Sequence, residues 1–163
     1  MSVSVITEGA NVREGEFLAW DDMGVEAEVA EFLYALVRVL KPRVVVESGT
    51  GRGYASLALA AALAENGEGV LHTFEPIRRF QDEARVRLEG LPVEFHDGLA
   101  CEGWDGPADL VFVDSWGEVR ATDLAYWIPT GMPMVVHDAH EHRSLLPAEG
   151  FVIDTPRGLW VRL

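Results

Sequence analysis

The sequence predicts an α/β protein with one open, mostly parallel sheet and helices on both of its faces. Short apolar strands alternate with segments whose apolar residues recur at helical spacing. A glycine-rich loop also joins the first of these strands to the helix that follows it. The length of 163 residues fits a single domain, 1–163, and we find no internal repeat or linker that would divide it.

The first elements follow from local patterns. Apolar residues recur at helical spacing over 25–40, and Pro42 ends that helix. Residues 43–47 are a continuous β-branched run, which is typical of a parallel strand buried on both faces. The glycine loop then leads into a helix over 55–64, which the Asn-Gly pair at 66–67 closes.

The alternation continues to the end of the chain. Residues 150–154 and 159–163 flank a turn and predict a closing hairpin, whose strands would be antiparallel at one edge of the sheet. Residues 1–24 lack periodicity, and we interpret them as a cap or lid. The other expected elements are strands over 70–75, 92–96, 110–114 and 134–137, a helix from Pro76 in its first turn to Leu88, and a helix over about 118–127.

Composition narrows the classes of partner. The net charge is −14, and the arginines between 78 and 87 are interleaved with acids, so we expect no nucleic-acid partner. No apolar run reaches about 18 residues, so we expect no membrane span. The N-terminus is too polar for a signal peptide. The single Cys101 excludes an internal disulfide and suits the cytoplasm.

The stretch VVVESGTGRGYASLALAAAL is the most informative part of the chain. The strand ends at Glu47, so the loop with Gly49, Gly51 and Gly53 lies at the edge of the sheet where such proteins bind ligands. Glycines let a backbone turn tightly and approach a ligand closely. The spacing differs from the dinucleotide motif G-x-G-x-x-G, and no Gly-Lys-Ser/Thr follows as in a P-loop.

Acids follow the strands at matching places. Glu75 ends the second strand, where a carboxylate can accept hydrogen bonds from both hydroxyls of a ribose. Asp97 follows the third strand and Asp114 ends the fourth, so with Glu47 four successive strands end in or just before an acid. Together with the glycine loop, this pattern predicts an adenosine-containing ligand.

Over roughly residues 25–163 the chain resembles the class I S-adenosylmethionine-dependent methyltransferases. VVESGTGRGYASLALA resembles their first motif, HTFEP the second and HDG the motif that contacts adenine. The resemblance implies a seven-stranded sheet of order 3-2-1-4-5-7-6, whose last-numbered strand is antiparallel, and S-adenosylmethionine as cofactor. The cofactor-binding residues that it implies are Glu47, Ser48, Gly49, Thr50, Gly51, Gly53, Glu75, Pro76, Asp97, Gly98, Asp114, Ser115 and Trp116.

Within that class, LVFVDS, VVHDA and DTPRGLWV are similar to small-molecule O-methyltransferases of the catechol and caffeoyl-CoA groups and their shorter bacterial relatives. The resemblance implies methyl transfer to an oxygen of a small molecule. It also implies a divalent cation such as Mg²⁺ at Asp114 and Asp138, which would lower the pKa of the acceptor hydroxyl. Asp114, His137 and Asp138 are the resulting candidates for catalysis.

The chain also departs from this pattern. The histidine that often follows the fourth strand in the bacterial relatives is missing from DSWGE, and Ala139 stands where the catechol type has Asn. The third metal ligand is therefore open. The candidates for a ligand or a general base are His137, His140, Glu141 and His142.

Other interpretations stay open. A nucleic-acid N-methyltransferase would carry an Asp/Asn-Pro-Pro-Tyr motif where this chain has DSWG. A cofactor-binding module without methyl transfer, with a regulatory or scaffold role, is the second alternative. Trp116, Trp20 and Tyr54 either cover the site or pack, and residues 139–149 are a second candidate lid segment. A homo-oligomer interface would draw on Phe17, Trp20 and Trp160.

Overall fold

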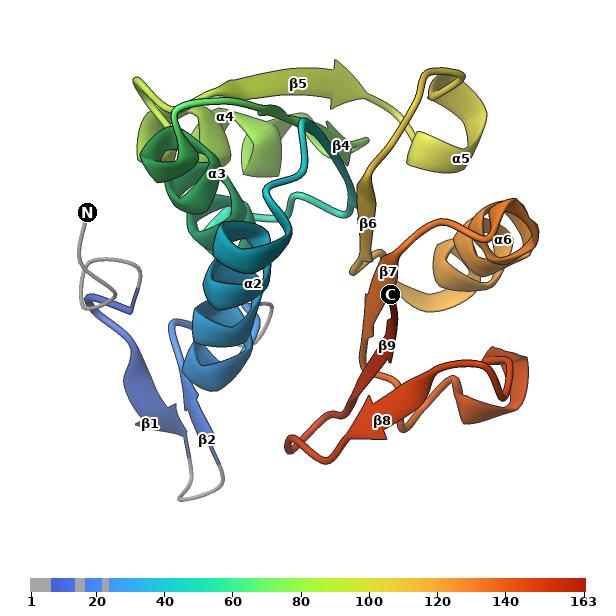
Figure 1. Ribbon diagram of the computed structural model, residues 1–163. Helices are drawn as coiled ribbons and strands as arrows, with labels where there is room; N and C mark the ends of the chain where they lie inside the picture. Colours follow the sequence, from blue (N-terminus) through green and yellow to red (C-terminus); the bar gives the residue numbers. More distant parts are fainter. Residues whose placement is uncertain (1–6, 14–16, 22–23) are drawn as a thin grey trace.

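A seven-stranded sheet forms the centre of the computed structural model, which describes residues 7–13, 17–21 and 24–163 (Figure 1). The strand order is β5-β4-β3-β6-β7-β9-β8. Numbered from β3, this is the predicted order 3-2-1-4-5-7-6, and β9 is antiparallel to both of its neighbours. The strands are β3 (Val44–Ser48), β4 (Val70–Glu75), β5 (Val93–Asp97), β6 (Leu110–Val113), β7 (Met134–His137), β8 (Phe151–Ile153) and β9 (Leu159–Arg162).

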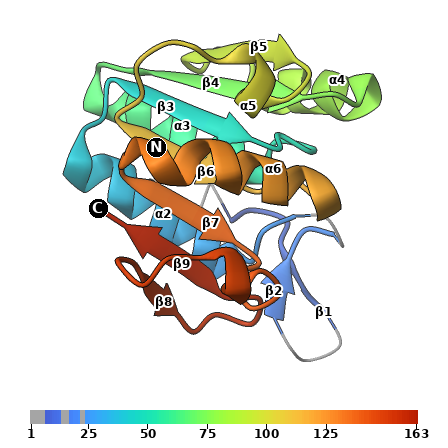
Figure 2. The same ribbon diagram turned by 90° about the vertical axis from the view of Figure 1, so that its right-hand side faces the viewer.

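Helices cover both faces of the sheet, as the sequence predicts. Figure 1 shows α2, α3 and α4 on one side and α5 and α6 on the other, and Figure 2 shows α6 in front of the strands with α2 and α3 behind them. The helices are α2 (Ala27–Leu40), α3 (Tyr54–Asn66), α4 (Arg78–Arg87), α5 (Ala100–Gly103) and α6 (Gly117–Trp127), with 3₁₀ turns at Ile128–Thr130 and Arg143–Leu145.

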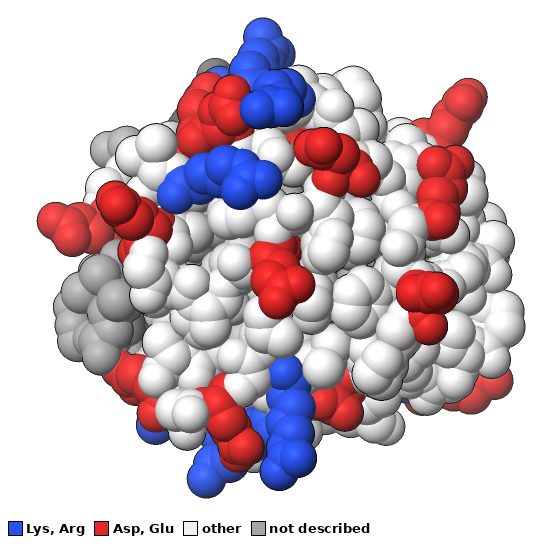
Figure 3. All heavy atoms as spheres, turned by 90° about the horizontal axis from the view of Figure 1, so that it is seen from above, with Lys and Arg blue, Asp and Glu red and all other residues white. Residues whose placement is uncertain are grey.

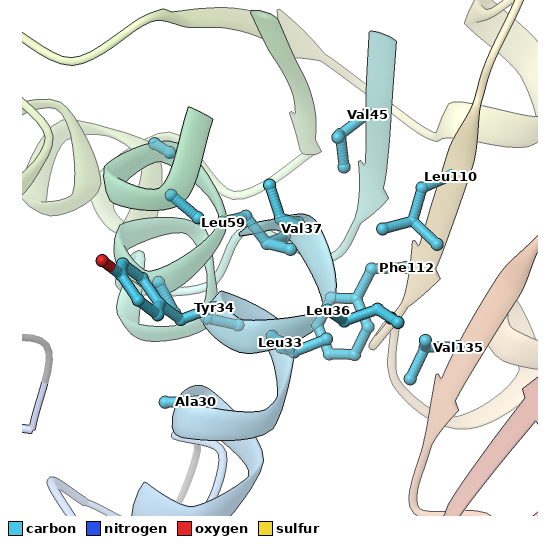
Figure 4. Packing of buried hydrophobic residues seen from close by; sticks show 14 of the residues in the cluster. Ala30, Leu33, Tyr34, Leu36, Val37, Val45, Leu59, Leu110, Phe112 and Val135 are labelled. Carbon is cyan, nitrogen blue, oxygen red and sulfur yellow. The ribbon is translucent and has the colours of Figure 1, made fainter. Parts of the chain in front are cut away.

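The larger core lies between the sheet and the helices α2 and α3 (Figure 4). Leu33 and Val37 of α2 share this core with Phe112 and Val135 of the sheet, and all four side chains are fully buried. The alanine-rich helix α3 is buried along most of its length because it packs between α2 and the strands. This packing fixes the starting point of α3, and with it the glycine loop.

Three features differ from the prediction. A short hairpin, β1 (Asn11–Arg13) and β2 (Phe17–Ala19), precedes α2, where no periodicity is present in the sequence. The four-residue helix α5 is likewise new. Pro76 does not enter the first turn of α4, which begins at Arg78, because the Glu75 side chain accepts the amide of Ile77 and holds residues 76–77 in an extended connection.

The predicted oligomer interface is wrong for Trp160, which is 2% exposed and belongs to the second core cluster. Trp20 is half-buried and stacks on Tyr54, with 4.8 Å between the ring centroids. The side chain of Phe17 lies outside the part of the chain that is described, as do residues 1–6, 14–16 and 22–23 of the predicted lid.

Basic and acidic side chains are mixed on the surface, as the sequence predicts. On the face shown in Figure 3, arginine and lysine side chains lie beside acidic ones and form no continuous basic surface. Within the described residues, no helix combines the length and the apolar character that crossing a membrane requires.

Candidate functional site

A cavity of about 520 Å³ lies at the carboxyl ends of β3, β4, β6 and β7. This volume is in the range of small-molecule sites. The predicted site residues that line it are Ser48, Gly49, Thr50, Gly51, Glu75, Pro76, Gly98, Asp114, Ser115, Trp116 and Asp138. The fold therefore brings most of the predicted cofactor residues to one place.

The glycine loop forms one wall of the cavity. The amides of Gly49 and Thr50 both donate to the carbonyl of Phe74, at 3.1 Å each, which ties the loop to the end of β4. A Cβ on Gly49 would lie 2.6 Å from the carbonyl oxygen of Asp114, so only glycine fits where the loop crosses β6. Gly51 has φ +51° and nothing within 4 Å of the position of a Cβ, so a side chain there would project into open space.

Glu75 connects the loop to the second strand. Its carboxylate is almost buried and accepts the amide of Gly51 at 2.8 Å and the amide of Ile77 at 2.9 Å. Each carboxylate oxygen has a second lone pair, so two hydrogen bonds from a ligand can still be accepted. Glu75 is thus held rigidly at the wall of the cavity.

Three predicted cofactor residues do not line the cavity, and their part in cofactor binding stays a prediction. Glu47 is fully buried behind the loop, where it accepts the hydroxyls of Ser56 and Thr73 at 2.5 Å each. A Cβ on Gly53 would lie 3.0 Å from Cβ of Ala84, so this glycine permits close packing of α3 on α4. Asp97 is exposed and accepts the side-chain amide of Gln81 at 3.2 Å.

Burial changes the pKa of the Glu47 carboxyl. Loss of solvent raises the pKa of its carboxyl to about 7, and the two hydroxyl donors offset only part of that effect. Glu47 ends a strand and looks like a ligand contact in the sequence, but its carboxyl lies in the interior of the protein.

Six side chains form a closed ring beside the cavity, and we call it the charge ring. Acids and bases alternate around it in the order Glu26, His137, Asp114, Arg120, Asp138 and Arg157. With His137 protonated, three positive charges balance three negative ones.

The contacts of the ring are short. His137 bridges two acids, with Nε2 2.6 Å from Glu26 Oε2 and Nδ1 2.8 Å from Asp114 Oδ1. Arg120 bridges the next pair, with Nη2 3.2 Å from Asp114 Oδ1 and Nη1 2.9 Å from Asp138 Oδ2. Arg157 closes the ring, with Nε 3.3 Å from Asp138 Oδ1 and 3.5 Å from Glu26 Oε2.

The ring shifts the proton affinities of its members. Burial alone lowers the pKa of His137, but the Asp114 carboxylate and the hydrogen bonds to Asp114 and Glu26 outweigh it and raise that pKa to about 9. Burial raises the pKa of Asp138, but the positive charges of His137, Arg120 and Arg157 lower it below its ordinary value. Near neutral pH His137 is therefore an imidazolium, and Asp138 is an ionised carboxylate.

These contacts do not favour His137 as a catalytic base. Its side chain is fully buried, does not line the cavity and already carries the proton that a base would have to accept. Asp114 and Asp138 do line the cavity. Asp138 has φ +54°, a left-handed conformation that is uncommon outside glycine and that often marks functional sites.

The divalent cation can be tested against these contacts. Ligand atoms of Asp114, His137 and Asp138 lie within 4.8 Å of one another, close enough for a metal ion. Arg120, however, lies between the two carboxylates, and both nitrogens of His137 are directed at acids. The residues present do not fit a resident divalent ion.

The other predicted residues separate into two groups. Glu141 and His142 line the cavity, whereas His140 lies against the closing hairpin, 3.4 Å from Asp154 Oδ1.

Trp116 lines the cavity with 65% of its surface exposed, so it covers the site rather than packing in the core. Tyr54 also lines the cavity, under the stacked ring of Trp20.

Sequence reasoning missed Glu26, Arg120 and Arg157, and it also missed the buried Asp123. Asp123 accepts the hydroxyls of Ser48 and Ser115, at 2.6 and 2.5 Å, and so joins two walls of the cavity. An available signal was the pair Arg120 and Asp123, two charged residues three apart on a helix that follows the fourth strand.

Two family profiles match the chain. One, described as a methyltransferase domain, covers residues 46–140, and the other, described as O-methyltransferase, covers residues 9–79. Among curated proteins, protein-L-isoaspartate O-methyltransferase of Shewanella amazonensis is 32% identical over 116 residues, which are 68% of this chain and 53% of that protein. The chain thus spans about half the length of the curated relatives it matches.

Solved structures are similar in fold. The O-methyltransferase TomG from Streptomyces achromogenes, in complex with SAM, gives a TM-score of 0.68 at 24% identity, over 86% of this chain and 81% of that one. An O-methyltransferase from Bacillus cereus, in complex with SAH, gives 0.67 at 18% identity, over 87% and 84%.

Proposed function

Because the chain belongs to the family of methyltransferase domains, we propose that it is an S-adenosylmethionine-dependent O-methyltransferase that acts on a small molecule. One observation carries the proposal: the glycine loop and the buried Glu75 meet in a cavity of about 520 Å³ at the carboxyl edge of the sheet. Fold alone would not support an activity.

The chain's own residues suit the cofactor. Glu75 offers two carboxylate oxygens to the ribose hydroxyls, and its bond to Gly51 keeps them in position. Gly51 leaves the adjoining space free, and Trp116 provides a broad exposed surface at the cavity rim. When bound, S-adenosylmethionine supplies a methyl group on a sulfonium, which an oxygen nucleophile attacks.

Asp114 and Asp138, which line the cavity, are the acids that we propose to contact the acceptor. Asp138 stays ionised, so it can accept a hydrogen bond from the acceptor hydroxyl and orient its oxygen. Methylation of a hydroxyl releases one proton. We propose that the imidazole of His142, which lines the same cavity, accepts this proton.

The test is turnover. The purified protein is incubated with S-adenosylmethionine and a panel of catechols, sugars and hydroxylated metabolites, and formation of the demethylated cofactor is measured. We expect turnover with at least one hydroxylated acceptor and a loss of at least tenfold in Asp138→Asn. Cofactor binding without turnover on any acceptor would instead favour a cofactor-binding module with a regulatory or scaffold role.

A second acceptor class has one observation in its favour. The similarity to protein-L-isoaspartate O-methyltransferases suggests a carboxylate on a peptide. An isoaspartyl peptide therefore joins the panel, and turnover with it alone would replace the small-molecule acceptor. The cytoplasmic location, the absence of a nucleic-acid partner and the formation of a homo-oligomer stay predictions.

A further inference from the structure

We infer that Arg120 is a built-in cation that takes the place of a divalent metal between Asp114 and Asp138, so that methyl transfer by this chain needs no metal. The part of this inference that concerns transfer rests on the proposed function. The part that concerns metal binding does not, because it can be measured on the protein alone.

Hydrogen bonds to several acceptors hold the guanidinium of Arg120 in place. Its guanidinium is 3% exposed and donates to one oxygen of each acid, at 3.2 Å to Asp114 and 2.9 Å to Asp138. It also donates to the carbonyl of His137 at 2.8 Å and, through Nε, to the carbonyl of Ser115. Five planar donors suit such a bridge between two carboxylates better than an ammonium would.

The same bonds explain why a metal would be unwelcome. Mg²⁺ and Mn²⁺ require carboxylate oxygens that point at the ion. Here the oxygens that converge are already bonded to arginine or histidine, and Arg157 approaches Asp138 from the other side at 3.3 Å. An incoming ion would have to displace a buried guanidinium and remain close to its charge.

Neighbouring charges support this inference. Two adjacent carboxylates repel each other unless a cation lies between them. In the charge ring each acid has a basic side chain on both sides, and the guanidinium of Arg120 is the one that contacts both Asp114 and Asp138 at 3.2 and 2.9 Å. The chain's own arginine thus lies where it neutralises both acids.

The experiment is an electron paramagnetic resonance titration with Mn²⁺. We compare the wild type with Asp138→Asn, Arg120→Ala, and the double variant Arg120→Ala/Asp138→Asn. Arg43→Ala, an exposed arginine remote from the cavity, is the matched control. Asp138→Asn is needed because His72, Glu94 and His96 form another group that could hold a metal, and only the Asp114/Asp138 site depends on Asp138.

We expect the wild type, the control Arg43→Ala and Asp138→Asn to bind Mn²⁺ alike. We expect Arg120→Ala to gain one site, at least tenfold tighter than any in the wild type, which the double variant loses. A wild-type Mn²⁺ site that disappears in Asp138→Asn would overturn the inference, even if Arg120→Ala does not fold. Failure of a folded Arg120→Ala protein to gain a site would also overturn it.

Activity gives an independent result. With an acceptor in hand, we expect the wild-type rate to be the same in EDTA and in added Mg²⁺, and a rate that falls tenfold in EDTA and recovers with Mg²⁺ would contradict the inference. If no acceptor is turned over under any condition, the proposed function fails while the Mn²⁺ titration still decides the metal question.

Discussion

Replacement of His137 by glutamine removes the member of the charge ring whose pKa is raised. The pKa values of Glu26 and Asp138 are lowered, so these two acids stay ionised between pH 6 and 10. In the wild type, the folded protein holds the His137 proton up to a pKa of about 9, whereas the ordinary value is 6.5. The glutamine side chain of the variant does not titrate at any pH, so the difference between the two proteins isolates this group.

The sign and size follow from proton linkage. Because the pKa is raised on folding, its stabilising contribution is complete below about pH 6.5 and is lost as the pH rises through about 9. A tenfold change in proton affinity is worth about 1.4 kcal/mol, so the wild type should lose about 3 kcal/mol through His137 between pH 6 and pH 10. Titration of Cys101 at alkaline pH affects both proteins alike.

The assay is urea unfolding followed by tryptophan fluorescence, at pH 6 and at pH 10, for the wild type and His137→Gln. We expect the variant to be less stable at pH 6, since Glu26 and Asp114 lose a charged partner, and the gap to narrow by about 3 kcal/mol at pH 10. If both proteins change equally between the two pH values, His137 is not held protonated and the charge ring does not exist as described.

Three further changes test other parts of the structure. Gly51→Val should leave the protein folded but abolish cofactor binding in calorimetry, because the side chain would project into the cavity; wild-type affinity would reduce the loop to a simple turn. Burial raises the pKa of Glu47 to about 7, so the wild type should lose about 3 kcal/mol of stability as the pH rises from 4.5 through about 7. Glu47→Gln should not show this loss, and identical pH profiles of the two proteins in thermal melts would show that Glu47 is ionised when folded. Phe112→Ala should cost about 3–5 kcal/mol in urea unfolding, as expected for a fully buried ring, and a loss below about 1 kcal/mol would contradict the packing.

The fold could be predicted from the sequence because its signals are local. The β-branched run at 43–47 and the helical spacing over 25–40 each identify an element without reference to the rest of the chain, and alternation then gives a parallel sheet. The hairpin of β1 and β2 has strands of only three residues, too short for a period to be visible. The family resemblance contributed the strand order, which local pattern alone does not specify.

The site was only partly predictable. Gly51 and Glu75 were found because Gly51 lies in the loop after one strand and Glu75 ends the next, so their position at the cavity follows from topology. Glu26 was missed because it is 111 residues from His137 and 131 from Arg157, and only the tertiary fold brings them together. The burial of Glu47 could not be predicted, because a strand end in the sequence does not indicate on which side of the loop its carboxylate lies.

The central claim is that the cavity binds S-adenosylmethionine through Glu75, and calorimetric titration of the demethylated cofactor into the protein tests it most directly. We predict one site in the wild type and in the control Glu89→Ala, whose residue is exposed and outside the cavity. Glu75→Ala should weaken binding by about 2–3 kcal/mol, the cost of losing charge-assisted hydrogen bonds. A folded wild type that binds no cofactor, or an unchanged affinity in Glu75→Ala, would contradict the account.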